Sequence, residues 1–345
     1  MVKVRFAPSP TGSLHLGGAL TAVANRRFAD ERSGTFVLRI DDTDVARAVE
    51  GSEQEIVREL EWLGIAWDEG PLRQSERAER YREAAGEVAM PDSDGALRFQ
   101  RSTLVRADGR PTYQLASVVD DLDLGITHVI RGKDLLPSTA LQEAIARALG
   151  AEPPEYIHHG LLVGDDGRKL SKRERAASLA GLRELGIPAE AVRAYLEELD
   201  LPRGDVHFDE SRLRRLAVEA LGELSDEELA GRVGVDARLG PALRGARDLV
   251  EARALAAQLT SAPPEQETSS PETLERFREL RAAGAETLDK DAAKAIVREL
   301  KAVGGDLRAL RLALTGAERG PELWTVLVAL SREDAIARSG VPRTG

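Results

Sequence analysis

The first forty residues change their hydrophobic spacing twice. Residues 2–7 alternate weakly between hydrophobic and polar positions, which is the period of a strand. From Gly17 to Phe28 the hydrophobic residues recur at helical spacing, and residues 35–40 run extended again. Because Pro8 and Pro10 cannot continue a strand ladder, a loop must separate the first strand from the helix. We therefore predict a βαβ unit.

The loop and the start of the helix carry candidate binding residues. In a βαβ unit the helix N-terminus lies beyond the carboxyl end of a parallel strand, where its free N–H groups favour phosphates. Gly17 and Gly18 let a ligand lie against the backbone, and His15 can donate a hydrogen bond to a phosphate or ribose oxygen. Taken alone, these residues fit an ordinary loop histidine before a glycine-started helix equally well.

The pattern between residues 41 and 163 is mixed. Asp41 follows the second strand directly, where ligand-facing residues of an open α/β sheet lie, although acidic strand ends also serve as caps or turns. The elements predicted next, in chain order, are a helix after a capping box of Ser52 and Glu55, a loop-like stretch over 66–80, a helix at 81–86, extended segments between 97 and 131 that include 118–119, a helix over 138–149, and a strand through 157–163.

Helical signals dominate the carboxyl-terminal part of the chain. Ser225 caps one predicted helix, Pro271 opens another after a polar linker at 260–270, and Trp324 is expected in the core of the last unit. Three arginines on one predicted helix are ordinarily solvent-facing and are also the best local candidates for phosphate contacts: Arg212, Arg214 and Arg215.

Composition excludes several classes of protein. The 345 residues are 42% hydrophobic and 31% charged, with no apolar run long enough to span a bilayer and no targeting pattern before the first strand, so we expect a cytoplasmic protein. The absence of cysteine rules out disulfides and thiolate metal sites, and the five histidines form no metal-binding pattern, so we expect no zinc. A net charge of −11 argues against a generally basic nucleic-acid binder but leaves room for a local basic face.

Two short motifs, taken together, change this picture. Four cations at 168–173 would by themselves indicate a solvated face or a linker. However, HLGG at 15–18 and KLSKR at 169–173 match in order and spacing the two signatures of class I aminoacyl-tRNA synthetases. Further stretches resemble glutamyl-tRNA synthetase in particular: RFAPSPTGSLHLGGALTA at 5–22, LRIDDTD at 38–44, RQSER at 73–77, DGRPTYQLASVVDDLDLGITHVIRG at 108–132, DGRKLSKR at 166–173 and LRLALTGAERGPEL at 310–323.

The resemblance runs from residue 2 to about 338 and implies a fold and an activity. The fold is an α/β Rossmann-type class I catalytic domain followed by an all-α carboxyl-terminal region. The activity is ATP-dependent ligation of glutamate to tRNA through glutamyl-adenylate. The attacking carboxylate is already ionised, so positioning and charge neutralisation carry the rate and no protein base is needed.

Roles for individual residues follow from the same resemblance. His15, Lys169 and Lys172 are the expected catalytic residues, and Mg²⁺ accompanies the ATP without a dedicated protein site. The ATP-binding set is Ser9, His15, Gly17, Gly18, Lys169, Ser171 and Lys172. For glutamate, the resemblance places Arg5 and Tyr113 at the side chain, Arg131 at the α-carboxylate, and Ser9 and Asp41 at the ammonium group, with Ser117 also in the set.

The chain also departs from the family pattern. Asp41 and Ser117 stand where the family usually has glutamate and asparagine, and about twenty residues at 81–101 replace a long insertion that grips the tRNA acceptor end. The short form also resembles the glutamyl-queuosine enzyme, which modifies an anticodon base but ends soon after the lysine-rich segment. A non-catalytic RNA-binding derivative is a second alternative.

We expect a catalytic domain at 1–186, a helical region contacting the tRNA stem at 187–258 and a helical anticodon-binding region at 259–345. The expected partners are L-glutamate and tRNA(Glu), with tRNA(Gln) as a further candidate, no membrane, and a monomeric state.

Overall fold

The computed structural model describes residues 1–44, 49–168, 170, 175–261 and 270–340. Their contacts divide the chain into two compact units: Met1–Arg183 with Val192–Arg212, and Glu184–Ala191 with Leu213–Gly345. The three regions expected from the sequence stay a prediction. Of the described helices, none is long and apolar enough to cross a membrane.

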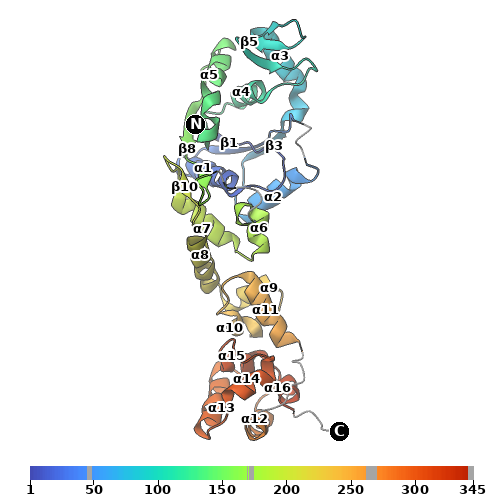
Figure 1. The fold of residues 1–345 in the computed structure, drawn as a ribbon, viewed down its shortest axis with the longest axis vertical. Coiled ribbons are helices and arrows are strands. Elements are labelled where there is room, and N and C mark those ends of the chain that lie inside the picture. Colours follow the sequence, from blue (N-terminus) through green and yellow to red (C-terminus); the bar gives the residue numbers. More distant parts are fainter. Residues whose placement is uncertain (45–48, 169, 171–174, 262–269, 341–345) are drawn as a thin grey trace. The chain divides into compact units, whose positions relative to one another are not determined.

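The first unit is built on parallel strands, and the predicted βαβ unit is present. It consists of β1 (Lys3–Phe6), α1 (Leu16–Glu31) and β2 (Thr35–Ile40), with Lys3 opposite Thr35. The sheet continues through β3 (Glu69–Arg73) on the far side of β2, while β7 (His128–Gly132) and β8 (Glu155–His159) form a second parallel pair beside β1. Figure 1 shows α1 and α2 (Ser52–Trp62) on one side of these strands and three helices on the other: α3 (Ala78–Val88), α4 (Tyr113–Asp123) and α5 (Thr139–Ala148).

Strand β3 corrects a prediction, because residues 66–80 were expected to be loop-like. The stretch lacks an alternating hydrophobic pattern, but its backbone pairs with β2, for example at Val37 opposite Glu69. A 3-10 turn, η1 (Gln74–Arg77), then leads into α3. Pairing with a distant strand, and not local hydrophobicity, makes this segment extended.

The part of the first unit after β3 combines three helices with a small antiparallel sheet. Its elements are α3 (Ala78–Val88), β4 (Met90–Pro91), β5 (Leu97–Phe99), β6 (Ser102–Val105), α4 (Tyr113–Asp123), η2 (Lys133–Ser138) and α5 (Thr139–Ala148). Tyr81, Leu104, Leu115 and Ile145 are fully buried where these elements meet. The predicted helices at 81–86 and 138–149 are confirmed.

Two other local predictions in this unit are wrong. Val118 and Val119 were expected to be extended, but they lie in α4, where their burial beside Leu115 gives the helix its core-facing side. Ser52 was expected to cap α2, but Gly51 holds the N-cap position in the left-handed conformation and no side chain caps that helix.

The strand expected through residues 157–163 is divided in two. Strand β8 ends at His159, and β9 (Leu162–Val163) pairs with β10 (Val206–His207). Between β8 and β9, the N–H of Gly160 donates to the carbonyl of Pro202, and Gly160 lies so close to the carbonyl of Gly204 that a side chain would not fit. The helical elements that follow are η3 (Arg175–Ala177), α6 (Leu179–Glu184), α7 (Ala189–Leu199) and α8 (Glu210–Glu223).

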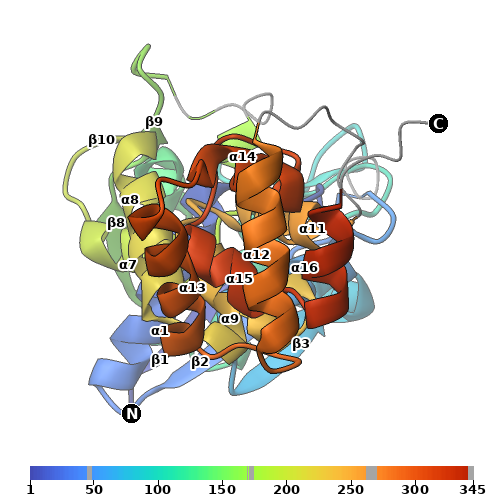
Figure 2. The same ribbon diagram turned by 90° about the horizontal axis from the view of Figure 1, so that it is seen from below.

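The second unit is helical, as predicted. Its further elements are α9 (Asp226–Val233), η4 (Ala237–Leu239), α10 (Gly240–Leu243), α11 (Leu249–Thr260), α12 (Pro271–Ala283), α13 (Lys290–Ala302), α14 (Leu307–Thr315), α15 (Leu323–Ala329) and α16 (Arg332–Arg338). Figure 2 looks onto α12 to α16, whose buried side chains include Phe277, Leu310 and Val326.

Two predicted helix starts in this unit are confirmed. Ser225 and Glu228 form a capping box at α9, and Pro271 opens α12.

Trp324 was expected in the core of the last unit, but it is only partly buried and packs against the edge of that core. The ammonium groups of Lys290 and Lys294 lie 5.4 and 5.1 Å from its ring centre.

Candidate active site

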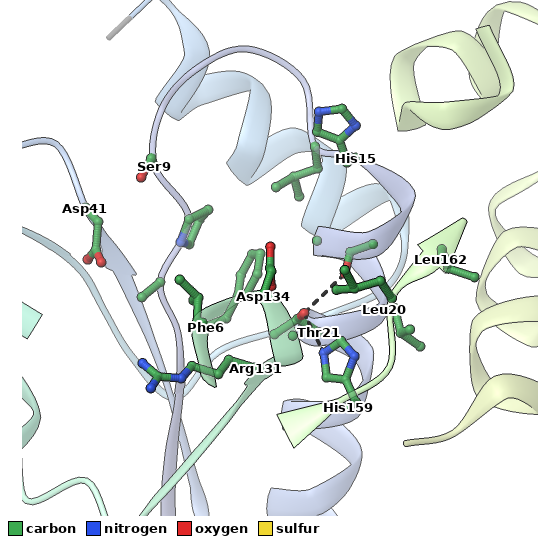
Figure 3. Close-up of a pocket in the computed structure, with 18 of the residues that line it drawn as sticks. Phe6, Ser9, His15, Leu20, Thr21, Asp41, Arg131, Asp134, His159 and Leu162 are labelled. Carbon is green, nitrogen blue, oxygen red and sulfur yellow. Dashed lines mark hydrogen bonds between the residues drawn. The ribbon is translucent and has the colours of Figure 1, made fainter. Parts of the chain in front are cut away.

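A cavity of about 280 Å³ opens at the carboxyl ends of the parallel strands of the first unit. Its walls come from the loop after β1, the first turns of α1, the residue after β2, the start of α4, the segment after β7 and the segment after β8. In Figure 3, Asp41 and Ser9 lie on the left of the cavity, and Thr21, His159 and Leu162 lie on the right. This is the edge at which open α/β sheets usually bind ligands.

Most of the predicted site residues within the described part of the chain line this cavity. They are Arg5, Ser9, His15, Gly17, Gly18, Asp41, Tyr113 and Arg131. Ser117 does not line it. Lys169, Ser171 and Lys172 lie outside the described residues.

The start of α1 gives one wall of the cavity a polar backbone surface. Among the described residues, no side chain caps this 16-residue helix, and its first turn carries no acidic residue. A Cβ atom added at Gly17 would meet nothing within 4 Å, and one at Gly18 would touch only a methyl group of Leu14, at 3.7 Å. The protein fold therefore gives no steric reason for either glycine, although glycine weakens a helix. The N–H groups of a first helical turn, beside space left by missing side chains, fit a phosphate group.

Beneath the opposite wall lies a cluster of buried charges. Arg39, fully buried on β2, donates to both carboxylate oxygens of Asp41, at 2.7 and 3.3 Å, and to Oδ1 of Asp121, at 2.7 Å. The Nε of Arg5 donates to the same Asp121 oxygen at 3.1 Å. Although burial lowers the pKa of Arg39, its neighbouring carboxylates outweigh burial and raise that pKa well above the ordinary value. The cluster therefore orients two residues of the cavity wall, because Arg39 holds Asp41 and Asp121 holds Arg5.

Arg131, at the end of β7, has a different environment. Its guanidinium is buried and donates to Oε1 of Gln142 at 2.7 Å, to Oγ1 of Thr139 at 2.9 Å, to Nε2 of His158 at 3.2 Å and, more weakly, to the hydroxyl of Tyr113 at 3.4 Å. All of these partners are neutral groups, and burial lowers the pKa of Arg131. Within the described part of the chain, no carboxylate pairs with this cation.

Gln142 explains where Ser117 lies. Its amide nitrogen donates to the Ser117 hydroxyl at 2.9 Å, and that hydroxyl donates to the backbone oxygen of Tyr113 at 2.7 Å. Ser117 therefore supports the groups that hold Arg131 from a position outside the cavity wall. Sequence reasoning missed Gln142 because an uncharged residue inside an ordinary amphipathic helix gives no functional signal.

His158 and His159, at the end of β8, were also missed as site residues. His159 lines the cavity and contacts Oγ1 of Thr21 on α1 through Nε2 at 3.0 Å, the contact dashed in Figure 3. His158 lies beside Arg131, and burial lowers the pKa of both histidines, with the Arg131 charge adding to the shift at His158. Two consecutive histidines at the end of a buried strand were the available signal.

Comparison with known proteins decides the family. The model of the family described as "tRNA synthetases class I (E and Q), catalytic domain" matches residues 1–91 and 86–207. The chain belongs to this family. It is similar to glutamate–tRNA ligase 1 of Rubrobacter xylanophilus, with 37% identity over 98% of this chain and 96% of that protein, and to glutamate–tRNA ligase of Synechococcus sp., with 32% identity over 96% of each.

Solved structures agree with the family assignment. A glutamate tRNA ligase from Elizabethkingia meningosepticum, crystallised in complex with its amino acid, covers 98% of both chains with a TM-score of 0.75 and 26% identity. The predicted fold class and the resemblance to glutamyl-tRNA synthetase are therefore confirmed.

This synthetase is shorter than its Rubrobacter relative. Their alignment runs over 429 positions although this chain has 345 residues, so more than 80 positions of the relative face gaps here. The part of this chain where a shortened insertion was expected holds α3 and the strands β4 to β6. That the missing residues belong to an acceptor-gripping insertion stays a prediction.

Proposed function

We propose that this chain joins L-glutamate to tRNA at the expense of ATP, as a glutamate–tRNA ligase. The observation that carries the proposal is Arg131. Among the described residues this buried cation has only neutral partners and no side chain caps the helix start, with its two glycines, on the other wall of the cavity. One wall suits a carboxylate and the other suits phosphates. Relatives that bear this name match the chain over nearly their full lengths.

The reaction has two steps. The α-carboxylate of glutamate attacks the α-phosphorus of ATP, forming glutamyl-adenylate and releasing pyrophosphate. A terminal ribose hydroxyl of tRNA then attacks the activated carbonyl carbon, and AMP leaves. The protein contributes position and charge, because the first nucleophile is already ionised.

The geometry favours a revised placement of glutamate. Arg131 and Tyr113 share a hydrogen bond and therefore serve one end of the substrate, and Figure 3 places Arg131 on the opposite side of the cavity from His15. Because the α-carboxylate must reach the phosphates near His15, we assign the side-chain carboxylate to Arg131, Tyr113 and Arg5. The family resemblance had implied the α-carboxylate for Arg131.

The same placement assigns the ammonium group to Ser9 and Asp41. Both residues line the cavity, and Arg39 holds the Asp41 carboxylate from beneath, which leaves each of its oxygens a further acceptor position. A carboxylate facing an ammonium forms a charge-assisted hydrogen bond.

ATP binds against His15, Gly17 and Gly18 in this proposal, with Mg²⁺ on its phosphates. Magnesium usually reaches such sites with the nucleotide and keeps several water ligands, so it needs few protein ligands. Lys169, Ser171 and Lys172 bind the phosphates as the family resemblance implies, and Lys169 and Lys172 neutralise charge in the transition state. The partners are tRNA(Glu), with tRNA(Gln) as a further candidate, and the protein acts as a cytoplasmic monomer without zinc.

The test is incubation with ATP, labelled glutamate and total tRNA, followed by locating the label. Label recovered with the 3′-terminal nucleoside after nuclease digestion at mildly acidic pH lies on the terminal ribose and supports ligation. Label retained on an anticodon base would assign the chain to the queuosine-modifying activity, and the absence of any transfer would leave it a binding protein.

A further inference from the structure

One buried carboxylate near the cavity has no part in the chemistry described above. Glu59 lies on α2 with none of its surface exposed. Its Oε1 accepts a hydrogen bond from the Ser13 hydroxyl at 2.5 Å, and its Oε2 accepts one from the backbone N–H of Leu14 at 2.7 Å. Burial raises the pKa of Glu59, and these two hydrogen bonds oppose that rise.

The loop that Glu59 holds is the one that precedes α1. Ser13 and Leu14 line the cavity, and the next residue is His15, which occupies the N-cap position of α1. A shift of Leu14 would therefore move His15 and the first turn of α1, including Gly17, together.

The other side of this loop is held by residues just before and at the start of α6. The backbone N–H of Ala180 donates to the Ser13 hydroxyl oxygen at 3.3 Å, and the N–H of Leu179 donates to the Leu14 carbonyl at 3.0 Å. His15 also forms an antiparallel bridge with Ser178. In sequence, these residues follow the lysine-rich motif at 169–173 by only a few positions. Ser13 thus joins Glu59 to the segment that leads out of the second signature.

The cost of burying the Glu59 carboxylate indicates that this position requires its hydrogen bonds to Ser13 and Leu14. Burying a carboxylate is costly unless it is well hydrogen-bonded, and neither of its two hydrogen-bond partners is a cation. Without the carboxylate, the buried N–H of Leu14 would lose its acceptor, at a cost of order 1–3 kcal/mol. Such a cost is easily avoided at an ordinary core position, where a leucine would pack without any polar partner.

We propose that Glu59 is a positioning residue for adenylate formation, which fixes Ser13 and Leu14 so that His15 and the first turn of α1 face the phosphates of ATP. The role rests on the proposed function. It acts through the loop, since Glu59 itself does not line the cavity.

The test compares Glu59→Ala with Glu59→Gln by glutamate-dependent ATP–pyrophosphate exchange in the presence of tRNA. Glu59→Ala should lower kcat about 100-fold, the scale of a 1 Å misplacement, and raise the KM for ATP, with the KM for glutamate changed less than about threefold. Glu59→Gln should recover most of this loss, because its amide oxygen still accepts from Leu14 and its NH₂ donates to Ser13. Glu61→Ala, on the exposed face of the same helix, is the matched control and should change neither parameter.

A purely structural role predicts a different result. Glu59→Ala would then lower the melting temperature and the active fraction, while kcat per folded molecule and both KM values stayed normal, and this would overturn the proposal. If Glu59→Ala does not fold, Ser13→Ala replaces it: it keeps the bond to Leu14 and should show the same selective effect on ATP at roughly 3- to 10-fold, the scale of one hydrogen bond. An unchanged KM for ATP in Ser13→Ala would also overturn the proposal.

Failure of the proposed function gives a separate signal. If the unmodified protein shows no glutamate-dependent exchange, ATP affinity is measured directly by calorimetry. At least tenfold weaker ATP binding by Glu59→Ala than by Glu61→Ala would still support the positioning role, and equal affinities would exclude it.

Discussion

Two arginines near the same cavity have buried guanidinium groups, but among the described residues only one of them has carboxylates beside it to balance its charge. Arg39 donates to Asp41 and Asp121, so its charge is balanced within the protein. Arg131 is almost as buried, with 4% of its surface exposed against 0% for Arg39, but its partners are an amide, a hydroxyl, an imidazole and a phenol.

In our proposal, this difference separates a charge with a structural role from a charge that binds the substrate. Taking a charge out of water costs several kcal/mol unless a counter-charge and hydrogen bonds replace the water. Arg39 has both within its own chain. Arg131 has hydrogen bonds that set its orientation but lacks the counter-charge, which the glutamate side chain would supply. We therefore expect removal of Arg39 to lower stability above all, with activity affected through Asp41 and Arg5, and removal of Arg131 to lower activity without a loss of stability.

The largest effect is expected for Arg39→Met. It leaves Asp41 and Asp121 buried with less compensation, so the free energy of unfolding should fall by about 3–5 kcal/mol. Denaturant titration measures this. Arg27→Met, which removes surface ion pairs with Glu31 and Asp200, is the control and should lower the free energy of unfolding far less than Arg39→Met does. If Arg39→Met lowers the free energy of unfolding no more than Arg27→Met does, Arg39 does not have the structural role assigned to it.

Arg131→Gln should lower activity and leave the stability of the protein intact. Losing the cation that faces a buried carboxylate costs about 2–5 kcal/mol, so kcat/KM for glutamate should fall roughly 30- to 5,000-fold. The free energy of unfolding should stay level or rise, because an uncompensated buried charge is removed. Exchange kinetics and denaturant titration on the same sample separate the two quantities. A large stability loss with normal kinetics in the folded fraction would contradict the assignment.

Arg5→Ala tests whether a cation that is already paired also selects the substrate. Its Nε is held by Asp121, so its remaining donors are oriented, and losing one charged hydrogen bond of about 1.5–3 kcal/mol should reduce the preference for glutamate over glutamine roughly 10- to 150-fold. The ratio is measured by adenylate formation with each amino acid, with the folded fraction checked by thermal melting. If the preference for glutamate over glutamine is unchanged, Arg5 has only a structural role, as a partner of Asp121.

The smallest expected effect is a pH dependence of stability. Burial lowers the pKa of His158 and His159, so between their folded values and the ordinary value of 6.5 the unfolded chain binds more protons. The free energy of unfolding should therefore decrease as the pH falls below 6.5. His158→Gln should flatten this decrease, since it removes the imidazole beside Arg131. Denaturant titrations at pH 7.5 and 5.5 measure the slope, and identical slopes in the two proteins would exclude the contribution of His158.

Much of the fold could be predicted because its signals are local. The change from alternating to helical spacing identified β1, α1 and β2, and Pro271 and Ser225 marked helix starts that the structure contains. The motifs at 15–18 and 169–173 pointed to the family by residue type and order alone, and the comparisons confirmed that family. The loop and strand ends that carry Arg5, Ser9, His15 and Arg131 were expected to be site positions, and these four residues line one cavity, while their roles stay a prediction.

The partners of these residues were decided only by tertiary structure. Arg5 meets Asp121 across 116 positions, Glu59 meets Leu14 across 45, and β3 is a strand because it pairs with β2. Whether a buried charge is balanced depends on which groups lie within about 3–4 Å of it, and sequence spacing does not determine that distance. Sequence alone therefore identified arginines suited to a carboxylate, whereas the packing of α4 and α5 against the strands decided that, of Arg5 and Arg131, Arg131 is the one without a counter-ion among the described residues.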